Sequence, residues 1–80
     1  MTPYRISYAP PADDALRKMN RRAAFEAAIG GTVGRDPYGH GSVHVGGDRD
    51  RREATVAGAV VRYVVSGSIR TVTVVRLISL

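Results

Sequence analysis

The apolar residues of this chain change their spacing near the middle, from a helical period to long β-branched runs. In the first half, YRISYA (residues 4–9) is a short β-prone stretch that predicts a strand ending at two prolines. Because proline is tolerated in the first turn of a helix, a helix is expected to begin at these two prolines and to continue over residues 12–19. Apolar residues at helical spacing in residues 21–33 predict a second helix, or a continuation of the first one after a bend.

The second half has the pattern of strands separated by glycine-containing turns. The stretch GRDPYGHG (residues 34–41) ends the helical part, and residues 46–51 are expected to form a charged loop. The β-prone segments are residues 42–45, 52–57, 60–66 and 69–80. Short separators between the last three suit hairpins, so these strands should be antiparallel neighbours.

This order of elements predicts an α+β fold in a small single domain over residues 1–80. An N-terminal strand would be followed by one or two helices packed on a mostly antiparallel sheet of four or five strands. Tyr63 is expected to face the core of that domain.

Isolated arginines interrupt the apolar faces of the last strands. Because alternate residues of a strand share a face, Arg62 lies with Val64, and Arg76 is expected to lie with Val72 and Val74. Burying an unpaired guanidinium is prohibitive. Each of these arginines should therefore lie on an open face, pair with an acid, or line a concave site.

The charge of the chain narrows the kind of partner it can have. A net charge of +5, with eleven arginines and one lysine, indicates a polyanion such as nucleic acid, a ribosome or an acidic protein. Only 6% of the residues are aromatic, which argues against a surface that stacks bases. The absence of cysteine and of a long apolar stretch leads us to expect a soluble, cytoplasmic protein that does not contact a membrane.

Three stretches together resemble the RelE/ParE superfamily of bacterial toxins. YRISYAPPADDALRKM (residues 4–19) is similar to the opening strand and helix of that family. RDPYGHGS (residues 35–42) resembles its turn after the second helix. RREATVAGAVVRYVVSGSIRTVTVV (residues 51–75) resembles its hairpin of an arginine-led strand, a glycine turn and two further strands. The resemblance implies a β-α-α-β-β-β order.

The resemblance also implies a toxin that is neutralised by a cognate acidic antitoxin in a hetero-oligomer. Members of the RelE branch are endoribonucleases that cut mRNA on the ribosome, and members of the ParE branch inhibit DNA gyrase without nuclease chemistry. A RelE-like endoribonuclease that needs no cofactor or metal ion is the leading hypothesis. A ParE-like toxin, a toxin with weak or lost activity, and a basic nucleic-acid-binding or ribosome-binding domain unrelated to toxins are the alternatives.

Cleavage of RNA by its own 2′-hydroxyl needs a proton acceptor, cations for the phosphate and a proton donor. The family's arginine at the start of a strand matches Arg52, which would stabilise the phosphate. Histidine is the side chain that most readily exchanges a proton near neutral pH, so His44 is the candidate for proton transfer. Arg62 would assist these two. The expected phosphate contacts are Arg49, Arg51 and Arg76, which would position RNA without reading its sequence.

Each of these assignments has a purely structural alternative. Arg52 could pair with Asp50 or Glu53, Arg62 could pair with Glu53, and His44 could simply face solvent. His40 is expected in a loop, and the two histidines alone are a weak metal signal.

The end of the chain differs from the family pattern. Active members commonly continue past the last strand into a tail with a catalytic tyrosine or histidine, whereas this sequence ends at VVRLISL. Either His44 or Tyr38 then supplies the proton, or the activity is weak, or the protein resembles the members that do not cut RNA.

Overall fold

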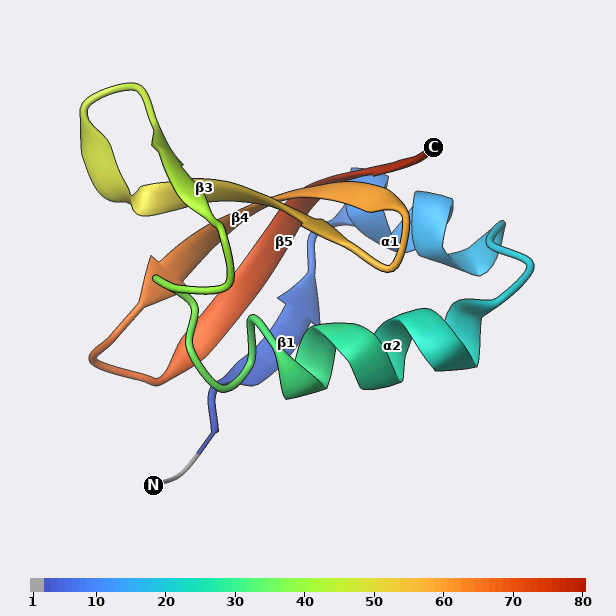
Figure 1. Ribbon diagram of the computed structural model, residues 1–80, viewed down its shortest axis with the longest axis horizontal. Helices are drawn as coiled ribbons and strands as arrows, with labels where there is room; N and C mark the ends of the chain where they lie inside the picture. The colour runs from blue at the N-terminus through green and yellow to red at the C-terminus, as the bar shows by residue number, and fades with distance from the viewer. Residues whose placement is uncertain (1–2) are drawn as a thin grey trace.

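The computed structural model describes residues 3–80, so the first two residues of the predicted domain lie outside it. Two helices pack on one face of a five-stranded sheet (Figure 1). The elements are β1 (Arg5–Tyr8), α1 (Pro10–Arg17), α2 (Arg22–Gly31), β2 (Val43–Val45), β3 (Asp48–Val56), β4 (Ala59–Ser66) and β5 (Thr71–Ser79). The strand order is β1-β5-β4-β3-β2, and only the β1–β5 pair is parallel. The predicted α+β fold is confirmed.

The helical region forms two helices rather than one. α1 begins at Pro10, since proline needs no hydrogen-bonding partner for its nitrogen there, and it ends at Arg17. α2 resumes at Arg22 and buries Phe25 and Ile29 against the sheet. Within residues 3–80, no helix is long and apolar enough to cross a membrane.

The core lies between the helices and one face of the sheet. Its centre is β4, where Val61, Tyr63 and Val65 alternate with outward-facing residues. The other buried apolar residues are Ala12, Leu16, Phe25, Ile29, Val33, Ala54, Val56, Ala59, Val72, Val74 and Leu77. The buried Tyr63 hydroxyl donates a hydrogen bond of 2.6 Å to the Pro37 carbonyl, which ties the loop after α2 to the middle of the sheet.

The charged residues 48–51 do not form the loop that the sequence predicted. β3 begins at Asp48, and Arg51 is paired with Val64 of β4. Gly46 and Gly47 form a tight turn in which Gly46 has a φ of +67°, a conformation that favours glycine. Because this turn takes only two residues, the arginines and aspartates that follow belong to the strand.

A β-bulge changes the faces of β5. Arg62 lies opposite Arg76, but Tyr63 lies opposite Val74, so Val75 is an extra residue between two paired positions. The prediction that Val72, Val74 and Arg76 share a face was therefore wrong. The two valines are buried in the core, whereas Arg76 is exposed on the opposite face.

We expect Tyr63→Phe to lower the free energy of unfolding by about 1 kcal/mol, because it removes the donor to the Pro37 carbonyl. Urea denaturation measures this as a lower midpoint with an unchanged slope. Tyr4→Phe is the matched control, since the Tyr4 hydroxyl makes no hydrogen bond within residues 3–80. Equal midpoints for the two variants would show that the Tyr63 bond does not stabilise the fold.

Candidate functional site

The face of the sheet opposite the helices carries three of the predicted arginines. Arg51 comes from β3, Arg62 from β4 and Arg76 from β5, and all three are exposed. Glu53, Arg62 and Arg76 lie directly opposite one another on three adjacent strands, and we call these three residues the arginine row. With two neighbouring apolar side chains, the row lines a hollow of about 290 Å³.

The arginine row contains more positive than negative charge. Glu53 Oε2 accepts a hydrogen bond of 2.7 Å from Arg62 Nε, and this is also an ion pair. Arg76 forms no ion pair within residues 3–80. Like charges directly opposite each other destabilise a sheet. A phosphate beside the two guanidiniums would relieve that repulsion, because arginine binds phosphate through charge-assisted hydrogen bonds.

Arg52 points to the other side of the sheet. It shares the face of Ala54 and Val56, which are buried under the helices. Its guanidinium donates to Ser42 Oγ at 3.0 Å, to the Arg49 carbonyl at 2.9 Å, to the Ser42 carbonyl at 3.2 Å and to the Tyr38 carbonyl at 3.4 Å. These acceptors come from the loop before β2 and from the start of β3. The geometry is that of a clamp on the loop, and neither Asp50 nor Glu53 is its partner.

Tyr38 lies between charged groups next to this clamp. Its hydroxyl donates to Asp50 Oδ1 at 2.7 Å, and the guanidinium carbons of Arg49 and Arg52 lie 4.7 Å and 5.4 Å from its ring centroid. The hydrogen bond to Asp50, with a smaller contribution from burial, raises the pKa of the Tyr38 phenol. The phenol therefore stays protonated at neutral pH, with its proton directed at Asp50.

His44 lies opposite Arg52 in the β2–β3 pair and so belongs to the same side of the sheet. Its Nδ1 is 2.9 Å from the Gly46 carbonyl. Because a carbonyl can only accept, Nδ1 carries the hydrogen, and in the neutral ring Nε2 has a free lone pair. His40 lies in the loop with a φ of +55°. No group of three or more metal-ligating side chains occurs within residues 3–80.

The predicted site residues are thus divided between two places. Arg51, Arg62 and Arg76 share the open face, whereas Arg52 and His44 lie on the helix side, and Arg49 is stacked on Tyr38. Sequence reasoning gave Glu53 no chemical role. The alternation in β3 and the glycine turn after it place this carboxylate opposite Arg62. Both features can be recognised in the sequence.

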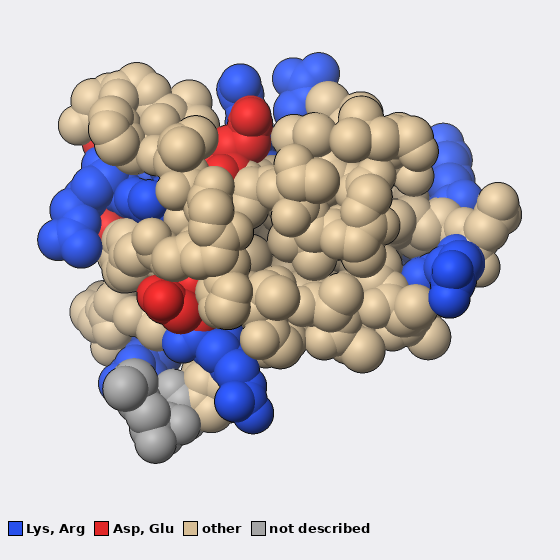
Figure 2. Space-filling model, in the orientation of Figure 1, with Lys and Arg blue, Asp and Glu red and all other residues tan. Residues whose placement is uncertain are grey.

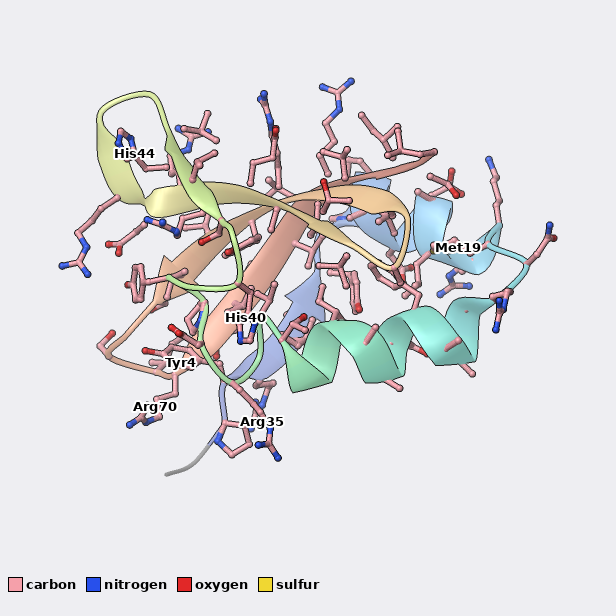
Figure 3. All side chains as sticks on the ribbon, viewed as in Figure 1. Tyr4, Met19, Arg35, His40, His44 and Arg70 are labelled. Atoms are coloured by element: carbon pink, nitrogen blue, oxygen red, sulfur yellow. The ribbon has the colours of Figure 1, made fainter. Side chains whose placement is uncertain are left out.

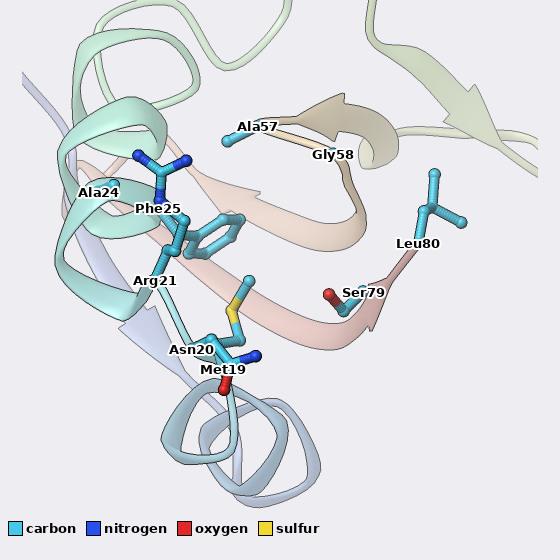
Figure 4. A pocket seen from close by; sticks show the side chains of 9 residues that line it. All are labelled: Met19, Asn20, Arg21, Ala24, Phe25, Ala57, Gly58, Ser79 and Leu80. Carbon is cyan, nitrogen blue, oxygen red and sulfur yellow. The ribbon is translucent and has the colours of Figure 1, made fainter.

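A second hollow, of about 440 Å³, lies between the α1–α2 connection and the end of β5 (Figure 4). Phe25 forms part of its wall, and Leu80 lies at its rim. Arg21 is its one charged side chain. The hollow lacks a pair of groups that could exchange a proton, so it offers no catalytic chemistry.

Comparisons with known proteins identify the fold. No family model matches the chain, and no curated protein matches its sequence. Its structure is similar to a chain of the toxin–antitoxin complex RelBE2 from Mycobacterium tuberculosis, with a TM-score of 0.76 and 17% sequence identity. The alignment covers 98% of this chain and 99% of that one. The resemblance to the RelE/ParE superfamily is confirmed at the level of the fold.

We expect Asp50→Asn to lower the pKa of Tyr38, because the charged acceptor that stabilises the neutral phenol is removed. NMR titration of the tyrosine rings measures this directly. Tyr8 is the internal control, since burial, with a smaller contribution from Glu26, raises its pKa to about 12, and this value should not change. An unchanged Tyr38 pKa in the variant would contradict the interpretation.

Arg52→Gln is expected to destabilise the protein by about 2 kcal/mol, because the charged donors to the loop are lost. The free energy of unfolding in urea is the measurement. The matched control is Arg51→Gln on the open face, which should change stability by less than about 0.5 kcal/mol. If both variants are as stable as the wild type, Arg52 does not act as a clamp.

Proposed function

We propose that this protein is the toxin of a type II toxin–antitoxin module and acts as a RelE-like, ribosome-dependent endoribonuclease on mRNA. The fold supports the first part of the proposal. The observation that supports the second is the arginine row, which aligns two guanidiniums and a carboxylate on an open, hollowed sheet face. In this proposal residues 1–80 form one toxin domain.

The reaction assigned to the row is attack of a 2′-hydroxyl on the adjacent phosphate. The O2′–P bond forms and the P–O5′ bond breaks, which leaves a 2′,3′-cyclic phosphate and a 5′-hydroxyl. Arg62 and Arg76 stabilise the extra negative charge on the phosphorus oxygens. Glu53 accepts the proton of the 2′-hydroxyl, and water protonates the leaving O5′. Arg51 holds the neighbouring backbone.

The residues on the helix side have a supporting role in this proposal. Arg52 fixes the loop before β2 and the start of β3, and Arg51 and Glu53 project from that same strand. It is therefore a positioning residue. His44, at the exposed β2 hairpin, and Arg49, on Tyr38, lie at the edge of this region. An acidic antitoxin segment would neutralise the exposed arginines, and a ribosome would present the mRNA.

Purified protein incubated with mRNA is expected to generate new 5′ ends only when ribosomes are present, and primer extension maps these ends. Arg76→Gln should lower kcat by about 10²-fold, because a cation at the developing charge is removed. Arg21→Gln removes the same charge in the second hollow, outside the arginine row, and this variant should cut at the wild-type rate. Equal rates for both variants would exclude Arg76 from the reaction.

A ParE-like toxin that inhibits DNA gyrase is the second candidate. The separation of His44 from the arginine row favours it, since this histidine cannot exchange a proton with a phosphate bound there. A gyrase supercoiling assay beside the cleavage assay separates the two functions. Inhibited supercoiling with intact mRNA would establish the second candidate and rule out the first.

A further inference from the structure

Most ion pairs of the protein lie on its helices, and several arginines of the sheet and its loops have none within residues 3–80. The ion pairs are Arg17–Asp13, Lys18–Asp14, Arg22–Glu26 and Arg62–Glu53. In three of these four pairs, the two partners are four residues apart, which is about one helical turn. Arg5, Arg35 and Arg70 form no ion pair within residues 3–80, and all three are exposed. In Figure 2 the Lys and Arg side chains stand around the edge of the face shown, including its lower left part, and few lie in its middle.

The backbones of these three arginines lie close together, although they come from distant parts of the sequence. Tyr4 N donates to the Gly34 carbonyl at 2.7 Å, and Arg5 N donates to the Arg70 carbonyl at 2.9 Å. These bonds hold the start of β1, the loop after α2 and the β4–β5 turn together. Tyr4, Arg35 and Arg70 lie near one another in Figure 3. We call Tyr4, Arg5, Arg35 and Arg70 the basic corner.

The basic corner is separate from the arginine row. Arg5 is paired with Thr71 at the start of β5, whereas Arg76 lies five residues further along that strand. At about 3.3 Å per residue, this places Arg5 and Arg76 about 17 Å apart along the sheet. One phosphate cannot contact both sites, but successive phosphates of a folded nucleic acid can.

The chemistry of the corner favours a phosphate backbone over bases. The guanidinium carbon of Arg70 lies 5.4 Å from the centroid of the Tyr4 ring, so a guanidinium already covers that ring. The ring is therefore not free to stack a base. What remains exposed is a set of guanidinium donors, which bind phosphate oxygens without reading sequence.

A protein partner fits this corner less well. Protein interfaces are built around several buried apolar or aromatic anchors. Among the described residues beside the corner, Ile69 is the one large apolar side chain that is strongly exposed. We propose that the basic corner binds the phosphate backbone of folded RNA and anchors the protein beside the RNA that the arginine row contacts. This extends the proposed function by naming a partner surface, but binding at the corner does not require that the protein cut RNA.

The test is the binding of a short folded RNA hairpin, measured by fluorescence anisotropy between about 50 and 200 mM salt. The double variant Arg35→Gln/Arg70→Gln should bind at least about tenfold more weakly at low salt. The slope of log K against log salt should fall by about two, one for each arginine. The control Arg17→Gln/Arg21→Gln removes the same charge at the other end of the molecule and should keep the wild-type slope.

If the double variant and the control bind equally well, the proposal is overturned. It is also overturned if the double variant loses affinity for a poly-glutamate peptide but not for the hairpin, since the partner would then be an acidic protein. Circular dichroism checks that the variants fold. Arg35→Glu leaves the Arg70–Tyr4 contact in place and provides the same test should the double variant not fold.

The outcomes for the corner and for the arginine row can be told apart. If the wild type cuts no mRNA but binds the hairpin through the corner, the proposed nuclease function fails and the corner stands. If the protein cuts, the corner variant should raise KM and leave kcat unchanged, because these residues do not touch the reacting phosphate.

Discussion

The structure depends on the alternation of side chains along β4, the central strand of the sheet. Val61, Tyr63 and Val65 point toward the helices and are buried, whereas Arg62 between them points to the open face. A shift of one residue would put a guanidinium into the core and valines into water, so burial determines the register. The core and the arginine row are two results of this one pattern.

Much of this arrangement could be predicted from the sequence, because it follows from local periodicity. The helical spacing before Gly30 and the β-branched runs after Gly41 predict the element types. Ala57 and Gly58 both have positive φ, as the tight hairpin between β3 and β4 requires. That turn places Glu53 opposite Arg62, and the ion pair between them is the structural alternative that the sequence had suggested for Arg62.

The rest depends on contacts between distant segments. The bulge at Val75 depends on how β5 fits against β4, and no residue type marks it in advance. The acceptors of Arg52 are mainly backbone carbonyl groups, which every residue has. The identity of the neighbouring residues therefore does not predict that Arg52 acts as a clamp. The alternation of residues along β3 puts Arg52 on the face of Ala54 and Val56, which is the helix side. The resemblance to the toxin family favoured a phosphate-binding role for Arg52 instead. In the structure Arg52 lies on the helix side of the sheet, and the arginine row lies on the open face.

The arginine row is asymmetric, and this has a consequence for any ligand that crosses it. Arg62 Nε forms an ion pair with Glu53 Oε2 at 2.7 Å, whereas Arg76 on the next strand forms no ion pair within residues 3–80. Within the arginine row the formal charge therefore changes from negative at Glu53 on β3 to positive at Arg62 on β4 and Arg76 on β5. A nucleotide chain is itself directional, because its 5′ and 3′ ends differ. Such a chain meets a surface with its own polarity, so its two possible orientations across the strands are not equivalent.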